Sequence, residues 1–189
     1  MEKGSKVVDR RVKRTKKLLW DSLVSLILRK GYDHITIQEI IDEANIGRST
    51  FYSHYENKEQ LLFSGQPHLT EMLFQQGEEG AGVNFTTVFR HAWDNKDVAK
   101  ALFGKQSGHI LLNHIHDVVS LKLKDVFESI DTQKKGNSSK KEPFLIEATA
   151  AALVSLLSNW IENDMKIPIK EMDTMSKEIL SAMSRVNTV

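Results

Sequence analysis

A run of residues from Arg48 to His54 carries side chains that could read DNA bases. An arginine guanidinium can bond guanine through two hydrogen bonds, and a threonine methyl group can pack against thymine. Tyrosine and histidine can reach base edges or phosphates. Apart from the apolar Phe51, which we expect to be core, the run therefore predicts a DNA-facing surface made of Arg48, Ser49, Thr50, Tyr52 and His54.

Two short helices are expected to position this run. Thr36 and Glu39 have the spacing of a capping box, which predicts a helix over Ile37–Ala44. The turn Asn45-Ile46-Gly47 follows, because Asn and Gly tolerate the left-handed backbone of a tight turn. A second helix is expected over Arg48–Ser53, and the pair predicts a helix-turn-helix. The anchoring side chains are expected to be Ile40, Ile41, Ile46 and Phe51.

Two further residues stand at helix starts, where outward-pointing amide groups favour phosphate contacts. They are Thr36 and Lys58, the latter following the expected N-cap Asn57. Thr36 could instead serve only as a cap. Tyr55 is expected mainly to pack against the first helix of the chain, predicted from about Val12 to Lys30, with a phosphate contact through its hydroxyl as the alternative.

The N-terminus is strongly basic, although the whole chain has a net charge of only +1. Residues 1–17 contain eight Lys and Arg against Glu2 and Asp9. A basic arm beside a compact domain is a common electrostatic footprint for DNA, and the alternative is a solvated tail. Leucines and isoleucines at helical spacing then predict a helix from about Val12 to Lys30, ended by Gly31.

The rest of the chain is also expected to be helical, because it has few prolines and no strand-like alternation. A helix is expected to start at Asn57 and run toward Phe63. Residues 77–82 and 134–141 are expected to be loops. The remaining helices are predicted over Phe85–Trp93, Lys96–Phe103, Ser107–Ile130, Phe144–Asn163 and Ile169–Val186.

Several classes of site are not indicated. The chain has no cysteine, which excludes disulfides and thiolate metal sites. His109 and His116 share a helix face, but a metal site would need further ligands that the sequence does not show. No phosphate-binding glycine loop or nucleophile elbow is visible, so we expect no enzyme activity, cofactor or metal. Polar residues interrupt the apolar stretch Phe144–Ile161, so we expect a soluble, cytoplasmic protein that does not span a membrane.

The segment Ile35–Leu61 resembles the signature of the tetracycline-repressor (TetR) family of bacterial regulators. The most specific part is the string Thr-Phe-Tyr-x-His-Tyr-x-Asn-Lys-Glu-x-Leu at residues 50–61. Asn45 replaces the glycine usual in the turn, and Gly47 replaces the usual Ser or Thr cap. The resemblance implies a homodimer that binds a pseudo-palindromic double-stranded operator and whose body binds a small-molecule inducer.

We therefore expect an all-α protein with a DNA-binding domain over residues 1–62 and a regulatory and dimerisation domain over residues 63–189. Its expected function is that of a homodimeric repressor modulated by a ligand. A TetR-like co-regulator acting through protein–protein contacts is the alternative. A helical enzyme is a second rival, which would need a catalytic constellation in the body.

Two sets of body residues are candidates for these roles, and for both sets the alternative is an intramolecular core. The candidates for lining a ligand pocket are Phe89, Trp93, Phe103, His109, Leu112, His116 and Phe127. The candidates for a four-helix dimer interface are Ala148, Ala152, Leu156, Trp160, Met172, Ile179 and Met183.

Overall fold

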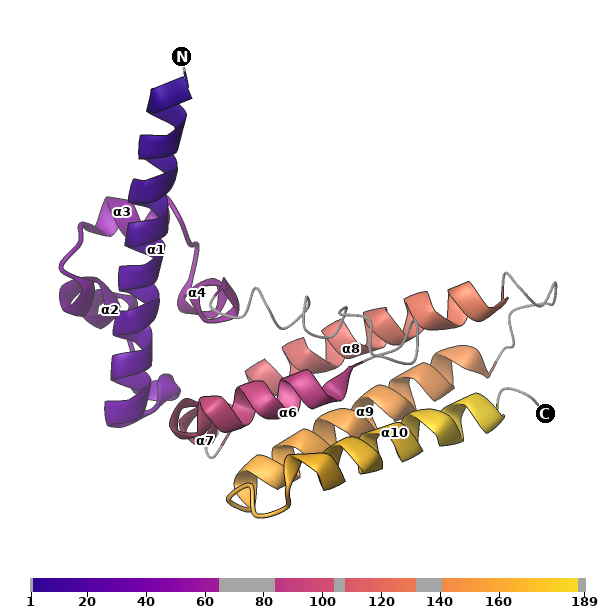
Figure 1. The fold of residues 1–189 in the computed structure, drawn as a ribbon. Coiled ribbons are helices and arrows are strands. Elements are labelled where there is room, and N and C mark those ends of the chain that lie inside the picture. Colours follow the sequence, from indigo (N-terminus) through magenta and orange to yellow (C-terminus); the bar gives the residue numbers. More distant parts are fainter. Residues whose placement is uncertain (1, 65–83, 104–107, 132–140, 187–189) are drawn as a thin grey trace. The chain divides into compact units, whose positions relative to one another are not determined.

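The computed structural model describes residues 2–64, 84–103, 108–131 and 141–186, with side chains described over 10–64, 84–103, 110–126 and 141–183. Within these ranges every regular element is a helix (Figure 1). This confirms the all-α prediction. The expected loop at 77–82 and nearly all of the one at 134–141 lie outside the described residues.

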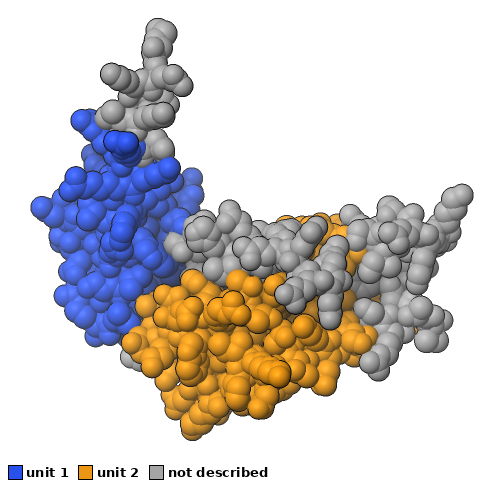
Figure 2. Space-filling view, in the orientation of Figure 1, with its two compact units in different colours: residues 1–67 blue, residues 68–189 orange. Residues whose placement is uncertain are grey.

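The chain forms two compact units, residues 1–67 and 68–189, which Figure 2 shows in blue and orange. We call them the head and the body. The sequence placed the boundary at residue 62, but the head extends at least to Ser64, the last residue of α4 (Lys58–Ser64). The Ser64 hydroxyl donates to the Tyr55 hydroxyl at 3.0 Å, which ties this helix end to the head.

The head begins with a single long helix, α1 (Glu2–Lys30). It starts well before the predicted Val12, because its first turns have no apolar stripe from which to read a helix. It ends as predicted at Gly31, which has a φ of 78° and donates its N–H to the Ile27 carbonyl at 2.9 Å. A short 3-10 helix, η1 (Tyr32–His34), follows and was not predicted.

The helix-turn-helix consists of α2 (Ile37–Ala44) and α3 (Arg48–Tyr52). Both start at the predicted residues. The helix α1 packs against α2 and α4, and α2 packs against α3. Apolar side chains from all four helices and η1 fill the head core; they are Leu19, Leu23, Leu26, Ile27, Tyr32, Ile35, Ile40, Ile41, Ala44, Phe51, Tyr55, Leu61 and Leu62.

The described helices of the body are α6 (Phe85–Asp94), α7 (Lys96–Phe103), α8 (Gly108–Asp131), α9 (Glu142–Glu162) and α10 (Ile169–Val186). Their ends match the predictions to within a few residues. The helix α9 packs against α7, α8 and α10, and α10 also packs against α6. In Figure 1, α9 and α10 run side by side along the body.

Within the described residues, α9 is the one helix long and apolar enough to cross a membrane by length and composition. Half of its most apolar stretch is buried inside the body. Its inward side chains include Ala150, Leu153, Leu157 and Trp160, all of which are buried. The apolar character of α9 is therefore explained by its place at the centre of the body core.

Two polar contacts fix the turn between α9 and α10. Trp160 Nε1 donates to the Ile167 carbonyl at 2.8 Å. Asp164 and Met165 have positive φ values of 62° and 53°, and the Met165 N–H donates back to the Trp160 carbonyl at 2.8 Å. Trp160 thus closes the end of α9 with both its backbone and its indole group.

Candidate DNA-binding site

The turn between α2 and α3 sets the direction of the second helix. Asn45 adopts the left-handed conformation (φ 50°, ψ 51°), and its N–H donates to the Asp42 carbonyl at 3.1 Å. The Ile46 N–H donates to the Ile41 carbonyl at 3.2 Å, which closes the end of α2. Asparagine tolerates this conformation better than most residues, so Asn45 can take the place of a glycine. Gly47 has an ordinary φ of −75° and caps α3 without a side-chain hydrogen bond.

The helix α3 has a buried side and an exposed side. Phe51 is 0% exposed and packs edge-on against Tyr52 and at a tilt against Tyr55, with ring centroids 5.4 Å and 6.0 Å apart. On the other side, Arg48, Ser49 and Tyr52 are exposed, and Tyr52 is 48% exposed despite its large apolar ring.

Thr50 and His54 are partly exposed beside these residues. All five predicted base-reading side chains therefore lie at the surface, while Phe51 fixes the helix to the core. An exposed aromatic side chain among small polar and cationic ones is the composition that a DNA-reading surface requires.

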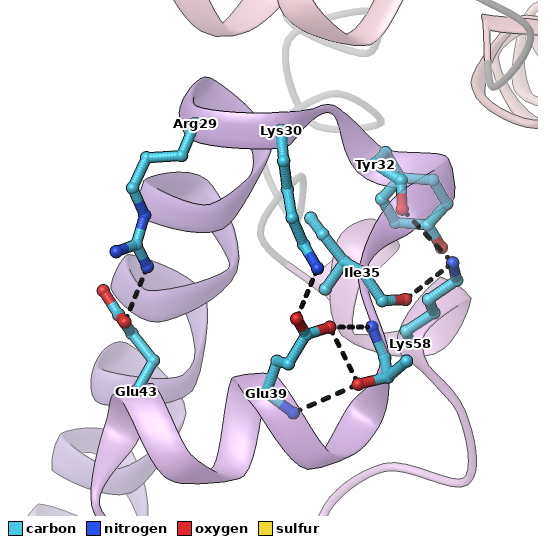
Figure 3. A network of polar contacts seen from close by, with 8 residues as sticks. Arg29, Lys30, Tyr32, Ile35, Glu39, Glu43 and Lys58 are labelled. Carbon is cyan, nitrogen blue, oxygen red and sulfur yellow. Dashed lines mark hydrogen bonds and ion pairs between the residues drawn. The ribbon is translucent and has the colours of Figure 1, made fainter.

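Lys58 makes structural contacts within the head that the sequence did not predict. Its ammonium donates to the carbonyls of Tyr32 at 3.2 Å and Ile35 at 3.0 Å, and lies 4.4 Å from the centre of the Tyr32 ring (Figure 3). It therefore satisfies the carbonyl groups at the end of η1 and joins α4 to the loop before α2. These two hydrogen bonds use two of the three N–H donors of the ammonium. The phosphate contact of Lys58 therefore stays a prediction beside this structural role.

Thr36 is a cap, the alternative that the sequence left open. Its hydroxyl accepts from the Glu39 N–H at 3.3 Å and donates to Glu39 Oε2 at 2.8 Å. The same carboxylate accepts from the Thr36 N–H at 2.9 Å, which completes the predicted capping box. Since the hydroxyl proton is already shared with Glu39, Thr36 has no side-chain proton left for a phosphate oxygen.

Two ion pairs fasten the end of α1 to α2 (Figure 3). Lys30 bonds Glu39, and Arg29 donates to Glu43 at 2.6 Å. The hydrogen bond from Lys30, with those from Thr36, lowers the pKa of Glu39 to about 2. The hydrogen bond from Arg29, followed by that from Ser25, likewise lowers the pKa of Glu43. These side chains line a groove whose charges already have partners, so they support the helix-turn-helix.

Tyr32 is a structural residue of the head that the sequence analysis missed. Its side chain is 1% exposed, and burial, followed by the charge of Glu59, raises its pKa well above the usual range for tyrosine. The position of this tyrosine directly after Gly31, which ends α1, was the one sequence feature that could have indicated its structural role. Its partnership with Lys58 had no sequence signal, because the two residues are far apart in the chain.

The predicted ligand-pocket residues have mixed positions. Phe89 and Phe103 are buried, and Phe89 packs edge-on against Trp160 with centroids 5.5 Å apart. Trp93 is 45% exposed and stacks on Trp160 at 6.3 Å. Phe89 and Trp93 thus both pack against Trp160, and Phe89 and Phe103 lie in the body core.

Two other pocket candidates lie on α8. Leu112 and His116 are half-buried, and His116 Nε2 lies 3.5 Å from Glu147 Oε2 on α9. The side chains of His109 and Phe127 lie outside the described residues. No group of three or more His, Asp or Glu suited to a metal occurs among the described residues.

The predicted dimer-interface residues divide into two groups. Trp160, Met172 and Met183 are buried within the body itself, so their side chains belong to its core and not to an outer face. Ala148 and Ala152 are exposed on α9. Leu156 and Ile179 are half-buried. The sequence could not separate these groups, because both follow the same helical spacing.

Comparisons with known proteins agree with this geometry. Residues 20–64 match the family described as "Bacterial regulatory proteins, tetR family", and residues 84–182 match the family described as "Transcriptional regulator C-terminal region" of the TetR group. The second match covers more than half of the chain.

Individual relatives match over different lengths. The uncharacterized HTH-type transcriptional regulator YxbF of Bacillus subtilis is 47% identical over 58 residues, which are 30% of this chain and 15% of YxbF. The biofilm operon icaADBC negative transcriptional regulator IcaR of Staphylococcus epidermidis is 39% identical over 41 residues, 22% of each chain. These matches span less than a quarter of either curated relative.

A solved structure extends the likeness over nearly the whole chain. The crystal structure of a TetR transcriptional regulator from Streptococcus agalactiae is 28% identical, has a TM-score of 0.64, and is covered over 98% of its length by 95% of this chain. Helical head, helix-turn-helix and body are thus shared with a regulator of known fold. The chain belongs to the TetR family of bacterial transcriptional regulators.

Proposed function

We propose that this protein is a homodimeric repressor that binds a pseudo-palindromic DNA operator and releases it when a small molecule binds the body. The exposed side of α3 carries the proposal, because Arg48, Ser49 and Tyr52 face outward from a helix that Phe51 fixes to the core. The relative IcaR is named as a negative regulator, which supports repression over activation.

The proposed dimer would form through the outer face of α9. Ala148 and Ala152 are exposed there, and small side chains let two helices approach closely. A twofold dimer presents two copies of α3, which can occupy major grooves about one helical turn, roughly 34 Å, apart. The two half-sites that such a dimer binds would together form the pseudo-palindromic operator.

The proposed inducer would act by shifting the population of two dimer states. A ligand that binds the body better in a state with mis-spaced heads must lower the affinity for the operator. The operator in turn lowers the affinity for the ligand by the same factor. Among the described candidates, the half-buried Leu112 offers a partly accessible apolar side chain and the half-buried His116 a partly accessible polar one. The inducer itself is of unknown chemistry.

A genomic DNA selection with the purified full chain tests the DNA-reading function. We expect enrichment of a two-half-site sequence. Arg48→Ala and Tyr52→Ala should each weaken binding to that sequence by about 1 to 3 kcal/mol, roughly 5- to 150-fold, with unchanged thermal stability. Failure of the wild type to enrich any sequence would overturn the proposal, and a protein-binding co-regulator would then be the better reading.

A further inference from the structure

The N-terminal part of α1 carries a dense set of cations that the helix-turn-helix does not use. Between residues 10 and 17 six Lys and Arg occur without a carboxylate, and all six are exposed. We call this segment the basic arm; its cations are Arg10, Arg11, Lys13, Arg14, Lys16 and Lys17. Among the described side chains of α1, those from Arg10 onward, the first fully buried apolar one is Leu19.

This arrangement is electrostatically unfavourable for an isolated helix. Arg10 lies three and four residues before Lys13 and Arg14, and like charges at these spacings repel each other. Lys17 is relieved by Asp21 at 2.6 Å. Within the described residues, Arg10, Arg11 and Arg14 have no ion pair. A polyanion lying along the basic arm would offset this repulsion between its cations.

The basic arm passes the end of the recognition helix. Lys16 Nζ lies 5.9 Å from the centre of the Tyr55 ring, and the Tyr55 N–H donates to the Phe51 carbonyl of α3 at 3.0 Å. Within the head, Figure 1 shows α1 continuing past α3 toward the N-terminus. Cations carried on this continuation are therefore close to any DNA that α3 reads.

We propose that the basic arm is a second DNA-contacting element, in which Arg10, Arg11 and Arg14 bind phosphates that flank the groove occupied by α3. This inference rests on the proposed DNA-reading function. Eight helical residues span about 12 Å, which is the axial length of three to four phosphates on one strand. Phosphate contacts of this kind raise affinity for all sequences and carry no base preference.

The test compares Arg10→Gln/Arg11→Gln/Arg14→Gln with the wild type by fluorescence anisotropy on labelled duplexes over a range of salt concentrations. Glutamine has a helix propensity close to that of arginine, so α1 should remain helical by circular dichroism. A matched control, Arg90→Gln/Lys166→Gln/Lys170→Gln, removes three exposed cations from the body. It lowers the net charge equally without touching the basic arm.

We expect the arm variant to lower the slope of log K against log salt by roughly 2 to 3, at about 0.9 per lost phosphate contact. This loss should appear equally on the selected site and on an arbitrary duplex, and the body control should keep the wild-type slope. The wild type should also bind more tightly when flanking base pairs are added, and the arm variant should not.

The outcomes separate this inference from the DNA-reading proposal. A selected site bound with an unchanged salt slope by the arm variant would overturn the basic-arm inference alone. So would a variant that keeps its DNA affinity but loses binding to anionic lipid vesicles, because the arm would then serve a membrane surface. Absence of any selected site would overturn the reading function, while the arbitrary duplex would still test the basic arm.

Discussion

Lys58 shows at the scale of a single residue that a motif does not reveal every contact of its side chains. A lysine at a helix start beside a DNA-reading helix suits a phosphate contact, which stays the prediction from the sequence. Within the head its ammonium also bonds the carbonyls of Tyr32 and Ile35 and lies over the Tyr32 ring. Those partners precede it by more than twenty residues, so no local pattern reports them.

Replacement of Lys58 by alanine should therefore destabilise the head. Two carbonyl groups would lose a charged donor, and hydrogen bonds to charged groups contribute about 1.5 to 3 kcal/mol. We expect the free energy of unfolding to fall by about that amount in urea titrations. The control Lys17→Ala removes only an exposed ion pair and should cost about 0.5 kcal/mol or less. Wild-type stability of Lys58→Ala would contradict this structural role, and weakened DNA binding by a variant of unchanged stability would support the predicted phosphate contact.

Glu39 predicts how the head responds to acid. Its pKa is lowered from 4.5 to about 2 in the folded chain, chiefly by the hydrogen bond from Lys30. A depressed carboxyl pKa contributes stability above the unfolded pKa, and that contribution is lost as the pH falls toward the folded pKa. Glu39→Gln should therefore be less stable than the wild type at neutral pH, and the gap should narrow between pH 4.5 and 2.

Urea midpoints of both proteins at several pH values between 7 and 2 would measure this gap. Glu178→Gln, at an exposed position on α10, is the control for removal of one negative charge. A gap between wild type and Glu39→Gln that stays constant over this range would contradict the assigned ion pair.

At the scale of elements, the sequence predicted a helix well where it contained capping residues, turn residues or apolar side chains at helical spacing. The capping box of Thr36 and Glu39 and the left-handed Asn45 give α2 its predicted bounds. The predicted start of α1 was wrong because the sequence of its first turns has no apolar residues at helical spacing from which a helix could be detected. The 3-10 helix after Gly31 was not predicted, and one of its contacts, the hydrogen bond from Lys58 to the Tyr32 carbonyl, comes from a residue far along the chain.

Gly47 leaves the recognition helix without a side-chain cap, and this can be repaired. A Cβ at this position would meet only Ser49 Oγ and Thr50 Oγ1, both at an ordinary 3.8 Å. Gly47→Ser should raise the free energy of unfolding by about 0.5 to 1 kcal/mol, through a cap bond and a less flexible unfolded chain. Gly47→Ala adds the Cβ without the cap, so the serine variant should exceed it by about 1 kcal/mol in urea titrations. Equal stability of the two variants would show that no cap bond forms.

At the scale of the whole molecule, the family and its two-unit plan could be predicted from one ordered string of residues. The sequence could not predict which side chains of the body helices face the core and which face outward. Helical spacing marks Trp160 and Ala152 alike as candidates for packing. The structure separates them, because Trp160 faces inward while Ala152 is exposed. Which face of an apolar helix points inward depends on the neighbouring helices, and a single helix sequence does not contain that information.

The proposed dimer predicts a strong effect of Ala152→Arg. An arginine on the outer face of α9 would hold two helices apart and bury a charge without a partner. We expect sedimentation velocity to show a monomer, and specific DNA binding to fall because two half-sites can no longer be read together. Asp97→Arg, at an exposed position on α7, should remain dimeric. A dimeric Ala152→Arg would move the interface away from this face.

The stacked indole rings at the turn between α9 and α10 also give the body a built-in optical probe. Trp93 is 45% exposed and Trp160 is 3% exposed, yet their rings lie nearly parallel, at an angle of 26°. Two chromophores this close couple electronically, so near-ultraviolet circular dichroism should carry a signal from their stacking. Since Trp20 is the only other tryptophan and belongs to the head, a change in that signal would report a rearrangement of the body in the unlabelled protein.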